Sequence, residues 1–265
     1  MRYHRQELND FSGPSGFAKT KTLHLDTGPV YHELQLFTNV NNDQIEQVEI
    51  KVNGDAIYDI TGQFLRDLEK YKNRYQAAGI FIVPFSDLTA RTQDGQHMTG
   101  LVTLPGDNIT VKVKFAAATA DQTTNNIVPD VTAVAITGDS VPVRELMPRM
   151  YRETIDGGKT GKVSFKTFDR GPRIRRAHLI ADIERLEIKR DKKVRFDLTK
   201  VQNNFALRHD GLVPVDGYYH FDPVQTRFML ADSLQTAGNS FEINPTLNTV
   251  GDFEVVFEVL ERVAA

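Results

Sequence analysis

The sequence contains no cysteine and no tryptophan, and aromatic residues make up only 9% of its 265 positions. Without cysteine, the chain can form no disulfide, no thiolate metal site and no cysteine nucleophile. Without tryptophan, it has little material for the stacked aromatic platforms on which many proteins hold sugars. No stretch approaches the roughly 20 apolar residues of a membrane-spanning helix. The N-terminus, Met1–Arg5, runs into polar residues and does not have the pattern of a secretory signal.

The composition is that of a folded globular protein. Hydrophobic residues make up 40% and charged residues 25% of the chain, which is enough apolar material for two cores. The formal net charge of −3 gives no general attraction to nucleic acid, so we expect no direct nucleic-acid partner. The length fits one large domain or two ordinary ones.

One stretch of the sequence occurs twice. Ile45–Lys51 and Ile183–Lys189 read IEQVEIK and IERLEIK, and they begin 138 positions apart (183 − 45). The same offset relates Asp59-Ile60-Thr61 to Asp197-Leu198-Thr199 and Gly79 to Gly217. Three matches in one register, each with strand patterning around it, predict a duplicated domain.

Short alternating strands dominate both copies. Ile109, Val111, Val113 and Phe115 alternate with polar residues, and Asn53-Gly54 is a strong hairpin signal after the strand that ends near Val52. Gly28-Pro29 and Gly171-Pro172 interrupt similar strands in the two copies. About eight strand candidates in each half predict an all-β protein, a double jelly roll of two eight-stranded sandwiches with a few short helices.

Helical spacing is rare. Phe64, Leu65, Leu68, Tyr71 and Tyr75 predict one helix, with Thr61 as N-cap, and Leu198, Val201 and Phe205 predict a weaker one in the second half. Val143, Leu146, Met147, Met150 and Tyr151 predict a connecting helix within Ser140–Arg152, although Pro148 should kink it. We therefore expect an N-terminal jelly roll in residues 1–137, a helical linker in 138–162 and a C-terminal jelly roll in 163–265. Residues 1–20 read as a polar arm or loop.

No catalytic group of residues stands out, so we expect no enzyme. Gly158-Lys159-Thr160 resembles part of a phosphate loop, but Glu153 stands where such a loop needs glycine. His24 and His32 have no acidic residue at a zinc-ligand spacing beside them. Aspartates in predicted loops could hold calcium, yet no EF-hand spacing is present, and aspartate commonly caps turns.

A basic stretch lies near the start of the second half, with only Asp169 opposing it. We favour a solvated strand face, or salt bridges to a neighbouring subunit, over the alternative of contact with anionic lipid headgroups. The residues of this stretch are Lys159, Lys162, Lys166, Arg170, Arg173, Arg175 and Arg176.

The order of these features resembles the major capsid protein of corticoviruses, tailless icosahedral bacteriophages with an internal membrane. The resemblance is carried by Ile45–Lys51, the helix Gln63–Tyr75 with Ala78-Gly79-Ile80, the strand pair from Gln96-His97-Met98 to Phe115, the segment Val143–Tyr151 and the ending Phe253–Leu260. It covers most of the chain as pattern and spacing, without an invariant signature. Pro148 departs from the unbroken linker helix expected in the family.

The resemblance implies a structural role. It implies pseudo-hexagonal homotrimers that tile an icosahedral shell over an internal membrane, with penton and minor membrane-associated capsid proteins as further partners. It also implies a protein of the virion, assembled in the cytoplasm of a bacterial host, and calcium ions that cannot be assigned to named residues. A carbohydrate-binding or hydrolysing β-sandwich is the alternative, because jelly rolls also occur in lectins.

Overall fold

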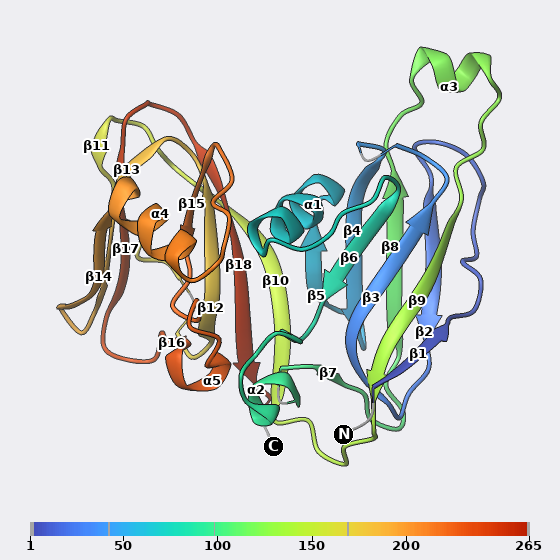
Figure 1. The fold of residues 1–265 in the computed structure, drawn as a ribbon, viewed down its shortest axis with the longest axis horizontal. Coiled ribbons are helices and arrows are strands. Elements are labelled where there is room, and N and C mark those ends of the chain that lie inside the picture. The colour runs from blue at the N-terminus through green and yellow to red at the C-terminus, as the bar shows by residue number, and fades with distance from the viewer. Residues whose placement is uncertain (1–2, 42, 98, 169, 264–265) are drawn as a thin grey trace.

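The computed structural model describes residues 3–41, 43–97, 99–168 and 170–263, which form two β-rich halves side by side (Figure 1). The N-terminal half contains β1 (His4–Glu7), β2 (Thr20–Leu25), β3 (Val30–Thr38), β4 (Ile45–Val52), β5 (Asp55–Ile60), α1 (Gly62–Tyr71), β6 (Ile80–Pro84), α2 (Gln93–His97), β7 (Leu101–Val102), β8 (Ile109–Phe115), α3 (Ala120–Thr124) and β9 (Val131–Gly138). The C-terminal half contains β10 (Leu146–Ile155), β11 (Gly161–Lys162), β12 (Arg173–Ile180), β13 (Ile183–Arg190), β14 (Lys193–Thr199), α4 (Lys200–His209), β15 (Tyr218–Phe221), α5 (Met229–Asp232), β16 (Leu234–Gln235), β17 (Phe241–Leu247) and β18 (Phe253–Arg262).

The two halves have the same sheet topology, strand for strand. The N-terminal half pairs β1-β9-β3-β6, with β7 beside β3, and the C-terminal half pairs β10-β18-β12-β15, with β16 beside β12. The second sheets are β2-β8-β4-β5 and β11-β17-β13-β14. Each half is therefore a jelly roll of eight main strands with one additional two-residue strand, and the expected double jelly roll is the observed fold.

Irregularities in strand pairing repeat as well. The register of β3 on β9 shifts between Tyr31 and Glu33, and that of β12 on β18 shifts between Ile174 and Arg176, which is 143 positions later (174 − 31). The β4–β5 ladder shifts after Ile50 and the β13–β14 ladder after Ile188, at the 138-residue offset (188 − 50). Because a bulge inserts one unpaired residue at a defined position, shared bulges support the duplication more strongly than shared strands.

The Gly-Pro pairs form matching corners in the two halves. Thr103 Oγ1 accepts a hydrogen bond from the Gly28 N–H at 2.7 Å and donates to the Pro29 carbonyl at 2.7 Å. Thr236 Oγ1 does the same for Gly171, at 3.0 Å, and Pro172, at 2.7 Å. Gly28 and Gly171 have φ values of 117° and 130°, which favour glycine. The repeated Gly-Pro sequence thus marks a repeated corner closed by one buried threonine.

The predicted connecting helix is wrong. Residues Leu146–Ile155 form β10, which pairs along its whole length with β18. Met147 and Met150 are buried, but Val143, which the helical stripe included, is 61% exposed. Proline disrupts a helix interior, whereas β10 meets its other neighbour, β5, at only one residue pair, so a residue without an N–H is tolerated in the strand.

Two other local expectations have mixed outcomes. His4–Glu7 forms the edge strand β1 rather than part of a loop, and the pattern missed it because all four side chains are exposed. The helices α1 and α4 are confirmed, and Thr61 is the N-cap of α1 as expected, but α1 ends at Tyr71, before the predicted Tyr75. Thr199 is the N-cap of α4. However, Val201 and Phe205, which suggested α4, are exposed rather than buried.

Candidate functional site: the contact between the two halves

The second sheet of the N-terminal half continues into the first sheet of the C-terminal half. Tyr58 of β5 and Met150 of β10 form a parallel pair, and both are fully buried. This pair joins eight strands into the path β15-β12-β18-β10-β5-β4-β8-β2, with β16 beside β12 (Figure 1). The N-terminal core extends across the contact to Leu207, Val215 and Tyr218. The two jelly rolls therefore share a sheet and part of a core.

Helix α1 fills the space between the two halves. The Val213 N–H donates to the Tyr71 carbonyl at 2.8 Å, and the Tyr218 hydroxyl donates to Asp67 at 2.9 Å. The local sequence favours this helix because Phe64, Leu65 and Leu68 form one buried face behind the Thr61 cap. Asp67 and Tyr71 lie beside Phe64 on the same side of the helix, and this side contacts the C-terminal half, where the Phe64 ring meets His178.

A buried arginine joins both halves at the centre of the contact. The Arg176 guanidinium on β12 donates to Asp222 at 2.8 Å, to Glu258 at 3.3 Å and to Asp87 of the N-terminal half at 2.8 Å. The Tyr71 hydroxyl also donates to Asp222 at 2.8 Å. The planar guanidinium of Arg176 has five N–H donors, so this one side chain can bind three carboxylates. This group, Arg176, Asp87, Asp222, Glu258 and Tyr71, is named here the junction cluster.

The charges of the junction cluster stabilise one another. Burial alone would raise the pKa of Glu258, but Arg176, Lys72 and His178 outweigh it and hold that pKa well below the usual value. Burial would likewise raise the pKa of Asp87, yet Arg176 and Lys72 lower it. Burial lowers the pKa of Arg176, but Asp222, Glu258 and Asp87 raise it well above its usual value. Glu258, Asp87 and Arg176 are therefore charged in the folded chain.

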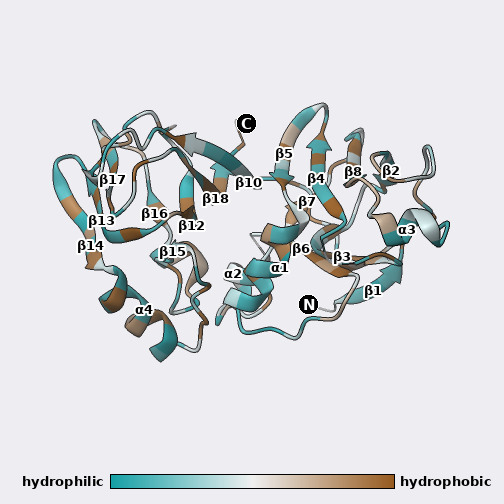
Figure 2. Cartoon of the chain, turned by 90° about the horizontal axis from the view of Figure 1, so that it is seen from above, coloured by the Kyte–Doolittle hydropathy of each residue, from teal (hydrophilic) through white to brown (hydrophobic). Residues whose placement is uncertain are grey.

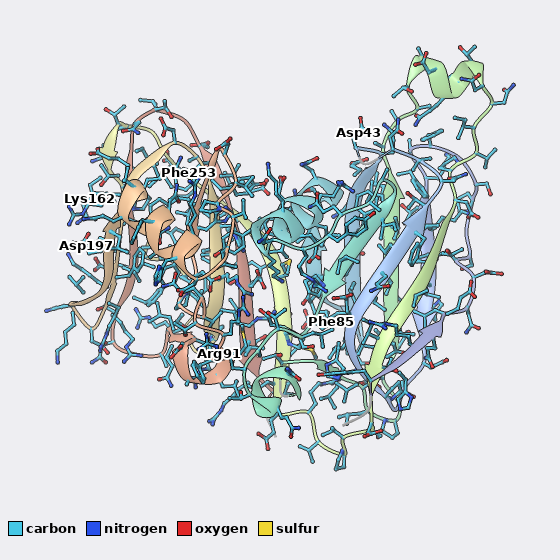
Figure 3. All side chains as sticks on the ribbon, viewed as in Figure 1. Asp43, Phe85, Arg91, Lys162, Asp197 and Phe253 are labelled. Atoms are coloured by element: carbon cyan, nitrogen blue, oxygen red, sulfur yellow. The ribbon has the colours of Figure 1, made fainter. Side chains whose placement is uncertain are left out.

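Arg175 forms a second link between the halves. Its side chain is 1% exposed and donates to the Phe85 carbonyl at 2.8 Å (Figure 3 labels Phe85). Arg175 occupies the bulge of β12, so it points to the same interior region as its neighbour Arg176. The corresponding bulge residue of the N-terminal half is His32, which is also fully buried.

Two histidines extend the junction cluster. The Val215 N–H donates to His220 Nε2 at 3.1 Å, so the proton of His220 must lie on Nδ1. That Nδ1 is 2.7 Å from Nδ1 of His178, which must accept, and His178 Nε2 then donates to Glu258 at 3.1 Å. Both imidazoles are thus neutral, each in a single tautomer. Consistent with this, burial, His178 and Lys200 hold the pKa of His220 well below 6.5.

The loop that follows β6 also contacts the other half. The Arg91 N–H donates to the Arg227 carbonyl at 3.0 Å, and the Arg91 guanidinium lies over the Phe228 ring. Ala90 packs with Val224 and Met229 in a small buried cluster. Figure 3 shows Arg91 beside the lower part of the C-terminal half. Within one chain, this loop fastens the two jelly rolls together.

The predicted basic stretch does not form one surface. Arg175 and Arg176 belong to the interior contact described above, so the expectation that they reach lipid or a neighbouring subunit is corrected by their burial. Lys162 pairs with Glu187 at 2.6 Å, Lys166 with Glu242 at 3.7 Å, and Arg173 donates to Ser233 at 2.9 Å. Lys159 and Arg170 are exposed, and Asp169 lies outside the described residues.

The described residues offer little for catalysis or metal binding. Nowhere in that part of the chain do three His, Asp or Glu side chains gather as metal ligands, so the calcium implied by the resemblance has no fitting cluster here. Ser86 and His32 Nδ1 lie 2.8 Å apart, but both side chains are buried and no substrate could reach them. None of the helices in the described segments is long and apolar enough to span a bilayer.

Sequence reasoning missed the junction cluster. Its members come from β12, β18, α1 and the segments that follow β6 and β15, and they are up to 187 positions apart (258 − 71). One signal was available: Glu258 interrupts the otherwise apolar run Val255–Leu260. A carboxylate inside such a strand needs a buried cation as partner.

Comparison with protein families identifies both halves. The model described as "Viral coat protein P2 N-terminal domain" matches residues 5–138, and the model "Viral coat protein P2 C-terminal domain" matches residues 147–263. The chain belongs to the viral coat protein P2 family. No curated protein sequence matches it.

Solved structures with the same fold are capsid proteins. This P2-family chain resembles the major capsid protein P2 from bacteriophage PM2 with a TM-score of 0.85 at 18% identity, covering 99% of this chain and 98% of that one. The major capsid protein of STIV, Sulfolobus turreted icosahedral virus, matches with a TM-score of 0.70 at 10% identity, covering 99% and 97%. The PBCV-1 virus capsid matches with a TM-score of 0.61 at 9% identity, covering 98% and 94%.

The family assignment fixes the general role of the P2-family chain. It belongs to a family of viral coat proteins rather than enzymes, and it is therefore a component of the virion. The corticovirus resemblance drawn from the sequence is confirmed. Neither comparison supports the carbohydrate-binding alternative.

Proposed function

We propose that the chain forms homotrimers of pseudo-hexagonal outline, and that these tile an icosahedral shell over an internal membrane. One observation carries the proposal: the two jelly rolls of the chain share every strand, their order and their bulges. Three copies of a chain with two such halves present six similar units around one axis. Closed rings of this kind are a common outcome of head-to-tail contacts.

The junction cluster supports the proposal physically. A shell tile must keep its outline under load, and two domains joined by a small polar contact would move relative to each other. Here the shared sheet, the shared core and the buried ion pairs of Arg176 hold the two halves in one orientation. The angle between the halves is thereby fixed before assembly.

The oligomeric state tests this function. Light scattering on the purified chain should give the mass of three copies of the 29.9 kDa chain, and class averages from electron microscopy should have a six-cornered outline. A chain that remains monomeric at every concentration and salt level would contradict the proposal. A stable dimer with two-fold symmetry would contradict it equally.

We also propose contact with anionic lipid at one end of the molecule. Two basic residues of the stretch belong to elements at opposite ends of the C-terminal half: Lys162 is part of β11, at the upper end, and Arg173 pairs with Gln235 of β16, at the lower end (Figure 1). Lys159 and Arg170 precede them closely in the chain and are exposed. If the strands stand upright in a shell, only one end can face a membrane. Each basic residue near an anionic surface contributes about 1 kcal/mol.

Vesicle binding distinguishes the two ends. Arg170→Glu with Arg173→Glu should weaken binding to phosphatidylserine vesicles if the lower end faces the membrane, and Lys159→Glu with Lys162→Glu should do so if the upper end does. Equal binding by both variants and the parent would remove the lipid proposal. Penton and minor membrane-associated proteins, and assembly in a bacterial cytoplasm, are further proposals that rest on the family resemblance alone.

A further inference from the structure

Helix α4 presents an apolar face that the described chain leaves largely exposed, apart from the His209 ring that stacks on Phe205. Val201 is 80% exposed and Phe205 is 73% exposed, while Leu207 on the inner side is fully buried. Figure 2 shows hydrophobic colouring on α4 at the outer side of the C-terminal half. Large apolar side chains gathered on a surface commonly mark a place where another protein binds.

The duplicated partner of α4, helix α1, has its corresponding face covered. Both helices follow a threonine N-cap, Thr61 or Thr199, so Asp67 corresponds to Phe205 and Tyr71 to His209 at the 138-residue offset. Asp67 accepts from Tyr218 at 2.9 Å, and the Tyr71 carbonyl accepts from Val213 at 2.8 Å. The face that α1 presents to the C-terminal half is therefore the face that α4 leaves open.

The surface that receives α1 also has an open counterpart. Val213 and Tyr218 correspond to Tyr75 and Ile80 of the N-terminal half at the same offset. Tyr75 is 91% exposed, and both residues line a groove of about 270 Å³ between α1 and β6. The contact between a helix and a groove is thus formed once inside the chain, by α1. The second helix, α4, and the second groove, beside Tyr75 and Ile80, do not meet within the chain.

We propose that α4 of one chain packs into the groove beside Tyr75 and Ile80 of a second copy of this chain. This inference rests on the trimer proposed above and names the contact that builds it. The contact would repeat between chains what α1 does within the chain. Because the two sides are different surfaces, the contact is head-to-tail and can close after three copies.

In each of the two contacts, the residues that would face each other have the same polarity. Within the chain, the pair Asp67–Tyr218 is polar on both sides. Between chains, the corresponding pair is Phe205 and Ile80, which is apolar on both sides. The change from polar to apolar thus occurs on the helix and on the groove together, as expected if the two surfaces meet.

The neighbouring sheet edges agree with this arrangement. β5 and β10, which meet within the chain, correspond to β14 and β1, and these two are edge strands in the described structure. Ion pairs do not carry over: Arg152, opposite Val256 of β18, corresponds to Glu7, opposite Val134 of β9, and Asp59 corresponds to Asp197. The apolar residues of α4 must therefore supply the affinity of the contact, which should depend little on salt.

Disulfide trapping tests the proposal cleanly because the chain has no cysteine of its own. In a chain carrying Tyr75→Cys and His209→Cys, oxidation should link the chains into covalent dimers and closed trimers on a non-reducing gel. These positions correspond to Val213 and Tyr71, whose backbones are hydrogen-bonded at 2.8 Å. A chain with Val250→Cys in place of Tyr75→Cys, at a position that is 64% exposed, is the matched control and should stay unlinked.

The single variants and the oligomeric state separate the outcomes. His209→Cys alone should give no linked species; a covalent dimer from this variant would overturn the proposal by revealing a two-fold contact. Trimers that form without a link between positions 75 and 209 would overturn this contact and leave the proposed trimer standing. A chain that never associates would overturn both proposals.

A second test needs no cysteine: a charged residue is placed on the apolar face of α4, and the strength of association between chains is measured. Phe205→Asp should weaken association about tenfold or more at each contact, because a buried phenylalanine would be replaced by a desolvated carboxylate. Val250→Asp should leave association unchanged. An equal loss in the two variants, or no loss in Phe205→Asp, would count against the proposal.

Discussion

Nδ1 of His220 lies 2.7 Å from Nδ1 of His178, and only one of these two nitrogens carries a proton. A proton added to either imidazole would place two N–H groups against each other in a buried site. Among the described residues, no carboxylate compensates a positive charge on His220, because its ring stacks on Tyr71 and Tyr218 and lies near Lys200. Glu258 faces His178 and is already bound to Arg176.

Stability should therefore fall on mild acidification. The pKa of His220 is held well below 6.5 by burial and by His178, so the folded chain keeps this histidine neutral. Above pH 6.5, the folded and unfolded chains bind the same number of protons here. Below it, the unfolded chain binds one more, and the free energy of unfolding falls by up to about 1.4 kcal/mol per pH unit. Urea denaturation at several pH values between 7.5 and 5 measures this slope.

Two variants isolate this histidine from the others. His220→Gln should reduce the slope below pH 6.5, whereas His24→Gln, at an exposed position of β2, should leave it unchanged. The same slope in His220→Gln and in the parent would show that the titrating group is elsewhere.

Removing the central arginine should be costly. Arg176→Met would leave the buried carboxylates Asp87, Asp222 and Glu258 without their guanidinium, and we expect a loss of about 3–5 kcal/mol in the free energy of unfolding. Arg185→Met is the matched control, because Arg185 binds Asp197 through two hydrogen bonds at an exposed position, where the change should be small. Similar losses in both variants would mean that the junction cluster contributes no more than a surface pair.

The two corner threonines should behave alike. Thr103→Val or Thr236→Val keeps the shape of the side chain but leaves the Gly28 or Gly171 N–H and the following proline carbonyl without a partner. We expect each variant to lose about 1–3 kcal/mol of unfolding free energy. Thr110→Val, at a half-buried position of β8, is the control and should change little. A loss in only one of the two corners would contradict their equivalence.

The α3 projection should be dispensable for folding. It stands above the N-terminal half (Figure 1) within residues 116–130, where the C-terminal half connects the corresponding strands through residues 248–252. Asn39 tethers its base by bonds to the Val128 carbonyl and the Asp130 N–H. Replacing residues 118–127 with a Gly-Ser link should change the unfolding free energy by about 0.5 kcal/mol or less. A large loss of stability would disprove this, and a selective loss of assembly would indicate contacts with neighbouring trimers.

Several features could be predicted from the sequence because their causes are local. Alternation along β8, the Asn53-Gly54 turn and the Thr61 cap depend on residues close together in the chain. The 138-residue offset between the repeated sequence segments recurs in the strands, the helix N-caps and the β-bulges. Local periodicity failed at Val143–Tyr151, where the helical spacing runs into strand β10, which begins at Leu146 and pairs with β18 near the end of the described chain.

The sequence by itself determined two copies of one sandwich, since turns, caps and alternation act over a few residues. Only the tertiary structure decided that Arg175 and Arg176 lie inside and that Phe205 lies outside. The environment of a charged or apolar side chain depends on what the rest of the chain brings opposite it. For Arg176, three distant carboxylates compensate the cost of burial, whereas Phe205 stacks on the neighbouring His209 ring and remains 73% exposed.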